Sequence, residues 1–284
     1  MEMAKTIIPM KRICLLFILF PLLAGCKTGM TWEKVAIDSH RTGVSIPNTD
    51  NVAEAIGVVD SLTGFYTAPN GTVFKDGSTP EVARLLIAAQ PAMAPVKEVI
   101  AYSTREMKAE APESELSNFV VDFLRAETSR AVKRPADVGI TNFGGIRVDM
   151  PEGDVTLDDI SSMFPFNNKL VWVELKGEDL VRLFDDMVAR NVQCVSGVKL
   201  EIKDHKVLKL EVGGKPVDPK KYYGVATVDF LLDGGDSLYV ARNARKLIQS
   251  DVIIGKAIEQ YVRKLTAEGK AIEYSTDGRV VEVQ

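Results

Sequence analysis

The order of helical and strand-like patterns constrains the fold of this chain more than any other sequence feature. Apolar residues recur every third or fourth position over residues 115–127 and 178–189, which predicts two amphipathic helices. Strand-like stretches surround these helices at residues 99–103, 138–141, 170–175, 198–202, 207–212 and 222–228. Because helices and strands do not alternate regularly, as they do in βαβ units, the sequence predicts an α+β domain with a mixed sheet flanked by helices.

The start of this domain is marked by a helix signal at residue 79. Thr79 is a suitable N-cap, Pro80 suits the first helical turn, and Pro91 with Pro95 is expected to end the helix. Four apolar residues share one face of this helix: Val82, Leu85, Leu86 and Ala89. We therefore assign the domain to residues 79–284.

The residues before the domain are rich in turn signals. Residues 26–78 are interpreted as a tether and loosely structured lead-in, with one short helix at residues 52–59 capped by Asn51 or Asp50. At the other end of the chain, residues 251–265 favour a helix and residues 279–283 a closing strand.

The N-terminus carries the pattern of a secretory signal over residues 1–25. Lys11 and Arg12 precede a short apolar run that ends in small residues before Cys26. This ending resembles the bacterial lipobox, which implies cleavage before Cys26 and lipid modification of that cysteine. The apolar run is shorter than the roughly 20 residues of a membrane-spanning helix. We expect an exported chain that is lipid-anchored to the cell envelope, in the periplasm or at the outer membrane; a buried core helix is the alternative.

Charge and cysteine content exclude other classes of protein. The net charge is −4 and no basic patch or tail is present, which argues against a nucleic-acid polymer as partner. Of three cysteines, only Cys194 lies outside the signal and the anchor position. An exported chain with one remaining thiol has no internal disulfide framework, so its hydrophobic core must supply the stability.

Several short motifs in the domain suggest a ligand site. A predicted strand is followed by the segment Asn142-Phe143-Gly144-Gly145-Ile146-Arg147. Further along the chain lie Phe166, Asn168, the pair Ser196-Gly197, and Phe230 with Gly234-Gly235-Asp236. Glycines let the backbone approach a ligand, arginine offers a planar fork of donors, and phenylalanines can enclose a flat ring. The candidate substrate-binding residues are Asn142, Gly144, Gly145, Arg147, Phe166, Asn168, Gly197, Phe230, Gly235 and Asp236.

Each of these residues also has a purely structural interpretation. Phe166 and Phe230 can fill a core, and Arg147 can form a surface ion pair. Asp236 can cap a turn through its own backbone, and Gly197 can serve only as a turn residue before a strand. These alternatives remain open at the level of the sequence.

Taken together, the motifs resemble a known family. Residues 98–284 are similar to the C-terminal, substrate-binding domain of the 5′-nucleotidase and UDP-sugar hydrolase family. The resemblance implies that Asn142 and Arg147 contact the nucleotide, with Arg147 at the phosphate. It implies that Phe166 and Phe230 stack on the base, and that Asp236 binds the ribose hydroxyls.

The chain departs from the family pattern at one place. The family usually has a phosphate-binding arginine shortly before the helix that here contains Asn118. This chain has Glu110, Ala111 and Pro112 there, and Arg105 lies further upstream. Phosphate binding is therefore expected to be weaker or to depend on Arg147 alone.

The residues for catalysis are missing from the sequence. Full-length enzymes of the family hold two metal ions in a separate domain that hydrolyses phosphate esters, and such a site needs a dense set of His, Asp and Asn ligands. This chain has two histidines, His40 and His205, and His205 is interpreted as a hairpin-turn residue. We assign no catalytic residue, no metal ligand and no cofactor to this chain, and expect divalent metals only on a partner domain.

Two functions follow from this combination. The first is the recognition half of a split, exported 5′-nucleotidase in nucleotide catabolism, whose metals come from a separate metallophosphatase chain. The second is a stand-alone nucleoside-binding lipoprotein for capture and uptake. A degenerate scaffold is a third possibility, and the presence of Phe166, Phe230 and Asp236 argues against it.

Overall fold

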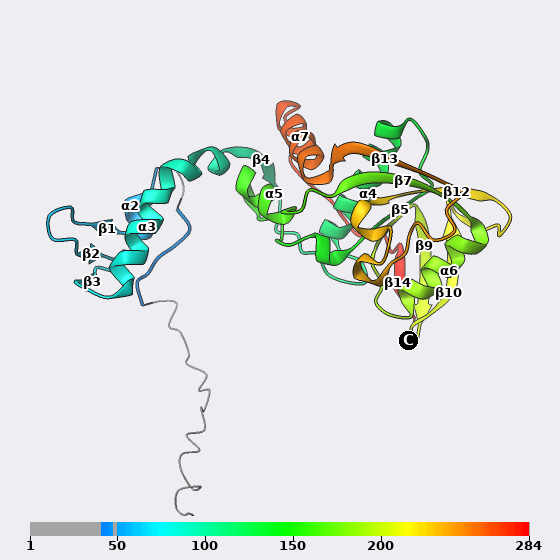
Figure 1. The fold of residues 1–284 in the computed structure, drawn as a ribbon, viewed down its shortest axis with the longest axis horizontal. Coiled ribbons are helices and arrows are strands. Elements are labelled where there is room, and N and C mark those ends of the chain that lie inside the picture. The colour runs from blue at the N-terminus through cyan, green and yellow to red at the C-terminus, as the bar shows by residue number, and fades with distance from the viewer. Residues whose placement is uncertain (1–40, 48–49, 284) are drawn as a thin grey trace, which may run out of the picture.

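The computed structural model describes residues 41–47 and 50–283 and contains a small N-terminal unit and a larger α+β domain (Figure 1). The predicted signal at residues 1–25, the predicted anchor Cys26 and His40 lie outside the described residues. In the part of the chain that is described, no helix combines the length and apolar character needed to cross a bilayer.

The large domain is built on a five-stranded mixed sheet with the order β13-β7-β12-β5-β8. Only β12 and β5 run parallel, and the other neighbours are antiparallel. The strands are β13 Lys246–Ile253, β7 Lys169–Lys176, β12 Tyr222–Val228, β5 Val138–Thr141 and β8 Cys194–Ser196. This sheet confirms the predicted α+β class with its mixed sheet.

Two smaller sheets complete the domain. A four-stranded sheet has the order β11-β10-β9-β14, and β4 pairs with β6. Their strands are β11 Lys215–Pro216, β10 Lys206–Val212, β9 Val198–Lys203, β14 Val280–Glu282, β4 Val99–Ser103 and β6 Gly153–Thr156. The predicted hairpin of residues 198–212 and the predicted closing strand are therefore confirmed.

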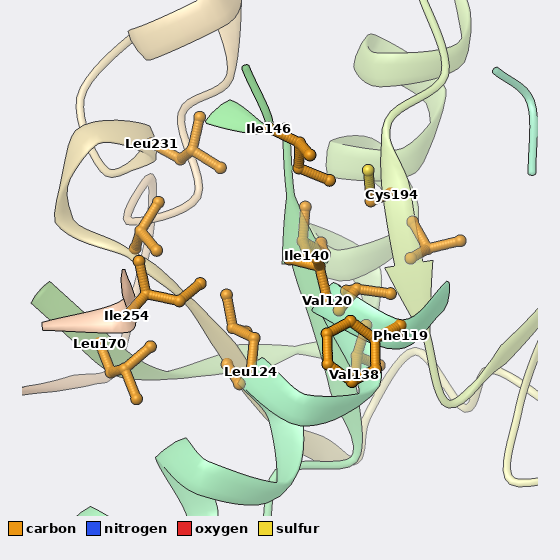
Figure 2. Close-up of a cluster of buried hydrophobic side chains, with 14 of the residues drawn as sticks. Phe119, Val120, Leu124, Val138, Ile140, Ile146, Leu170, Cys194, Leu231 and Ile254 are labelled. Carbon is orange, nitrogen blue, oxygen red and sulfur yellow. The ribbon is translucent and has the colours of Figure 1, made fainter. Parts of the chain in front are cut away.

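Helix α4, Glu115–Val132, supplies one wall of the core. Ser114 begins it with a reciprocal capping box to Ser117, which satisfies backbone donors at the helix start. Figure 2 shows Phe119, Val120 and Leu124 of α4 gathered with buried residues of the sheet, including Val138 and Ile140 of β5. The remaining helices of the domain are α5 Leu157–Met163, α6 Gly177–Val188 and α7 Ile254–Ala267.

The sequence misplaced the boundaries of several helices, and α4 continues to Val132, beyond its predicted end at residue 127. Helix α3 spans Ser78–Met93 and continues through Pro91. Because this proline lies in the last turn, the backbone hydrogen bond that it lacks does not interrupt the helix before its end. Helix α7 begins at Ile254, since residues 251–253 still belong to β13. Helix α2 ends at Ile56, and Gly57 at φ 91° breaks it before the next strand.

The lead-in forms a small unit of its own. Strands β1 Val58–Val59, β2 Tyr66–Thr67 and β3 Val73–Phe74 form an antiparallel sheet beside α2, Val52–Ile56, and α3. Its buried cluster contains only Tyr66, Ala68 and Ala83. The apolar face predicted for α3 is exposed, including Leu85 at 72%.

Candidate functional site

The glycine pair that follows β5 is closely flanked by the side chains of Asn142 and Asp236. A Cβ on Gly145 would lie 2.8 Å from Asn142 Oδ1, and one on Gly144 would lie 3.2 Å from Asp236 Oδ2. The turn is held from outside by Gln193, whose Oε1 accepts the N–H of Phe143 at 2.9 Å. The two glycines thus let the loop backbone pack closely against Asn142 and Asp236, and the approach of this backbone to a ligand stays a prediction.

A second loop brings Phe230 and Asp236 to the same place. A Cβ on Gly235 would lie 2.1 Å from the Phe230 carbonyl oxygen and 2.8 Å from its ring, so this glycine packs directly under the phenylalanine. Asp236 adopts φ 47° and ψ 32°, which is the left-handed region. Aspartate tolerates this region better than most residues with a side chain, and Lys133, Asp204 and Asn243 also adopt a positive φ in this structure.

Asn142 and Asp236 form the polar centre of the site. Asn142 Nδ2 donates a hydrogen bond to Asp236 Oδ2 at 2.5 Å, although 94 positions separate the two residues. Asn142 is buried, and its Oδ1 has no hydrogen-bond partner within the described part of the chain. A buried acceptor without a partner is unfavourable, so a ligand that donates a hydrogen bond here would be stabilised.

Asp229 ties the two phenylalanine loops together. Its Oδ1 accepts the backbone N–H of Phe230 at 2.9 Å and that of Lys169 at 3.1 Å. Lys169 begins β7, directly after the loop that carries Phe166 and Asn168. Asp229 therefore holds the relative position of the two rings, a role that the sequence did not reveal.

These loops enclose a cavity of about 230 Å³. It is lined by Asn142, Gly144, Gly145, Arg147, Phe166, Asn168, Phe230 and Asp236. Phe166 and Phe230 are each 48% exposed, so neither fills the core. Neither ring contacts another aromatic ring in the described residues, which leaves both available to a flat ligand.

Arg147 keeps its guanidinium available at this cavity. Nη1 donates to the carbonyl oxygen of Gly144 at 3.2 Å, and the backbone N–H donates to Met163 at 3.0 Å. It forms no ion pair with any carboxylate that the structure describes, which disposes of the surface ion-pair interpretation. Arg105, in contrast, pairs with Glu115 at 3.0 Å and with Glu273 at 3.6 Å and does not line the cavity.

Gly197 is the candidate that the structure does not bring to this cavity. It follows β8, and a Cβ there would lie 2.2 Å from the carbonyl oxygen of Asp137 at the other end of β5. Its φ of 76° and this close approach give it a structural reason to be glycine. The neighbouring Cys194 is buried, which raises the pKa of its thiol and removes it as a nucleophile.

The described residues do not fit a two-metal centre. Across residues 41–47 and 50–283, no group of three or more His, Cys, Asp or Glu side chains is placed to hold a metal ion. His205 lies in the turn between β9 and β10 with φ 59°, which confirms its interpretation as a hairpin-turn residue. The site can thus enclose and orient a ligand, and no hydrolytic step can be derived from its residues.

Comparison with known proteins found relatives that match part of this chain. "Protein UshA" of Yersinia enterocolitica is 27% identical over 172 residues, which covers 59% of this chain and 30% of that protein. "Trifunctional nucleotide phosphoesterase protein YfkN" of Bacillus subtilis is 27% identical over 188 residues, which covers 60% of this chain and 12% of that protein. The chain thus spans less than a third of the length of either relative.

The solved structures show the same fold. The 5′-nucleotidase precursor of Thermus thermophilus matches 76% of this chain and 45% of its own, with a TM-score of 0.64 and 24% identity. The NAD nucleotidase of Haemophilus influenzae matches 78% of this chain and 48% of its own, with a TM-score of 0.53 and 16% identity. Residues 94–242, just over half of the chain, match the sequence profile described as "5′-nucleotidase, C-terminal domain". The chain therefore belongs to the 5′-nucleotidase C-terminal domain family.

Proposed function

We propose that this chain is the nucleotide- or nucleoside-recognition half of a split, exported 5′-nucleotidase. It acts in nucleotide catabolism together with a separately encoded metallophosphatase. The observation that carries the proposal is the cavity in which two half-exposed phenylalanines, the Asn142–Asp236 pair and the guanidinium of Arg147 converge. No metal-binding group accompanies this cavity in the described residues, so the metals and the attacking water come from the partner.

The size of the cavity favours binding of a base and ribose inside it. Its volume of about 230 Å³ is below the roughly 300–1,000 Å³ of most small-molecule sites. The base lies between Phe166 and Phe230, where stacking tolerates different bases. The ribose hydroxyls donate to Asp236 and to Asn142 Oδ1, and the phosphate extends towards the exposed Arg147 and the partner.

Helix α3 offers a surface for the metallophosphatase chain. Its exposed apolar side chains follow helical spacing at Val82, Leu85, Leu86 and Met93. The Thermus thermophilus structure extends well beyond the part that this chain matches. We propose that the separate metallophosphatase chain covers this apolar face of α3.

The binding step is tested by calorimetric titration of adenosine and AMP into the purified chain without metal. Saturable binding that disappears in Phe230→Ala supports a metal-independent nucleoside site. Absence of binding for both ligands contradicts the recognition role.

The partner is tested by adding the chain to a secreted metallophosphatase from the same organism and measuring phosphate release from AMP. We expect faster release with the wild-type chain, and a smaller increase with Leu85→Glu, which puts a charge on the α3 face. Leu208→Glu is the matched control, because Leu208 is also exposed but lies on β10. No increase with any candidate metallophosphatase rules out the split enzyme.

A stand-alone nucleoside-binding lipoprotein is the second candidate. It is favoured by the small number of cations at the cavity, where Arg147 is the only basic side chain in the described lining and Arg105 is engaged elsewhere. A capture protein of this kind would prefer adenosine to AMP and would deliver it to a transporter. The ratio of the two affinities, together with the partner assay, distinguishes the candidates.

Both candidates place the chain outside the cytoplasm, on the lipid anchor predicted at Cys26. The support is the signal pattern of residues 1–25. Mass spectrometry of the chain from cell envelopes should find the N-terminus at Cys26 with attached acyl chains. A chain that retains residues 1–25 contradicts the anchor.

A further inference from the structure

A second cavity lies at the opposite end of β5 from the cavity lined by Asn142, Phe166 and Phe230, which we call the nucleotide cavity after its proposed ligand. Asn142 follows the last residue of β5 and lines the first cavity, whereas Asp137 precedes the strand and lines the second. The second cavity has a volume of about 730 Å³. Arg125 of α4 lines it together with Gly197 and the Gly213-Gly214 turn between β10 and β11.

Arg125 is the unusual residue of this cavity. Its guanidinium forms no ion pair or hydrogen bond with any residue that the structure describes, and its buried Nε has no acceptor. Two glycines make room for this side chain: a Cβ on Gly139 would lie 3.0 Å from its Cβ, and one on Gly197 would lie 3.0 Å from its Nη1. A half-buried cation without a partner is unfavourable, and an oxyanion would relieve that cost.

The carboxylates of the cavity are already engaged and do not neutralise Arg125. Asp122 and Asp277 both pair with Arg279, at 2.8 Å and 2.9 Å. Asp137 Oδ2 accepts the backbone N–H of Gly224 at 2.8 Å. The acidic residues are therefore held by groups other than Arg125.

Three lysines add positive charge around Arg125. Lys199, Lys215 and Lys221 line the cavity, and all three are exposed. None of them takes part in an ion pair within the described part of the chain, although Lys221 lies over the Tyr223 ring at 4.7 Å. The free charges that face the cavity are thus mainly positive.

We propose that this second cavity binds a compact oxyanion, with phosphate as its model ligand. The planar fork of Arg125 suits an oxyanion with two parallel acceptors, and the surrounding lysines favour a dianion over a single carboxylate. The site is separate from the nucleotide cavity and does not depend on the proposed nucleotidase role. The proposal assigns an oxyanion ligand to Arg125. It also places Gly197 in a binding site, although not in the one that the sequence predicted.

The test is a calorimetric titration of inorganic phosphate into the full chain at constant ionic strength, followed by the same titration with sulfate. We expect saturable binding of both anions, and Arg125→Gln should weaken it by about tenfold or more, because it removes a charged hydrogen-bonding group. Arg190→Gln changes an exposed arginine that lines neither cavity, so it is the control and should leave phosphate binding unchanged. Loss of binding in Arg147→Gln with retention in Arg125→Gln overturns the proposal, as does the absence of saturable binding.

A second variant keeps the test decisive if Arg125→Gln unfolds. Lys199→Gln combined with Lys215→Gln changes two exposed side chains and should not disturb the core. This double variant is expected to weaken phosphate binding several-fold, and NMR shifts of the Gly197 and Gly213 amides should follow phosphate in the wild type. Unchanged affinity in the double variant, or shifts confined to Gly144 and Gly145, contradicts the second site.

Discussion

Replacement of Phe230 by alanine is the most direct test of the nucleotide cavity. The ring is 48% exposed and lies on Gly235, so its removal opens no cavity in the core. The folded state should keep nearly all of its stability, because the loss of an exposed ring changes few packed contacts. Any change in ligand affinity can then be attributed to the ring itself.

The size of the effect follows from the area that a base can cover. An aromatic side chain offers about 150–250 Å², and nearly half of the Phe230 surface is exposed before a ligand binds. At about 25 cal/mol per Å², covering this area contributes about 2 kcal/mol, which is about thirtyfold in affinity. Measured base-stacking contributions of roughly 1–3 kcal/mol agree with this value.

The assay is calorimetric titration of adenosine into wild type, Phe230→Ala and a control, with thermal unfolding of each variant. Tyr102→Ala is a suitable control, because Tyr102 is 53% exposed on β4 and does not line the cavity. Phe166→Ala should resemble Phe230→Ala, since the two rings are equally exposed. A folded Phe230→Ala that binds adenosine within twofold of wild type refutes the stacking role.

Three further predictions test neighbouring parts of the structure. Arg147→Gln should weaken AMP binding by about tenfold and leave adenosine unchanged in calorimetry, because the guanidinium meets only the phosphate. Asp229→Asn should lower the midpoint of thermal unfolding and weaken adenosine binding, since the loops of Phe230 and Lys169 lose their shared anionic acceptor. Burial opposes ionisation of Asp122, but hydrogen bonds, led by the one from Arg279, lower the pKa of its carboxyl group overall. The Asp122–Arg279 pair therefore stabilises the folded state above pH about 3.9, and this stabilisation is lost as the pH falls through the pKa of Asp122 in the folded state. Asp122→Asn should lower the free energy of unfolding at pH 7 by about 3 kcal/mol in denaturant unfolding, a modest value because Asp122 is partly exposed. The variant should also lose less stability than wild type when the pH is lowered.

The sequence identified the loops that line the first cavity because their residue types and order are distinctive. It missed Gln193 and Asp229, whose hydrogen-bond partners lie 50 and 60 positions away along the chain. No local pattern distinguishes a positioning carboxylate from an ordinary turn residue. The positioning role of such residues can be recognised only from the three-dimensional structure, in which the segments that carry their hydrogen-bond partners lie side by side.

The position of Gly197 shows what strand direction adds to a sequence pattern. Strand β8 runs antiparallel to β5, with Cys194 opposite Thr141 and Ser196 opposite Gly139. The residue before β8, Gln193, therefore lies beside the turn of Phe143 that leads into the first cavity, and the residue after β8 lies at the far end of the sheet. A glycine next to a short strand is predictable, but the direction of that strand is not.

Strand β13 was missed for a different reason. Residues 246–253 contain Gln249, Ser250 and Asp251, so they do not alternate as a half-buried strand should. The strand lies at the edge of the five-stranded sheet, and its pairing with β7 shifts register between Gln249 and Ile253. An edge strand with an irregularity can carry polar residues because one side of it lacks a neighbouring strand.

The nucleotide cavity concentrates features that disfavour the ligand-free fold. Asp236 is held in the left-handed region, Asn142 Oδ1 is buried without a partner in the described structure, and two phenylalanine rings face solvent. Each feature costs stability by itself, and a nucleoside that donates hydroxyls and covers the rings offsets two of them. The convergence of these costs on one cavity of a well-packed domain supports the proposed binding role, because folding alone would favour their removal.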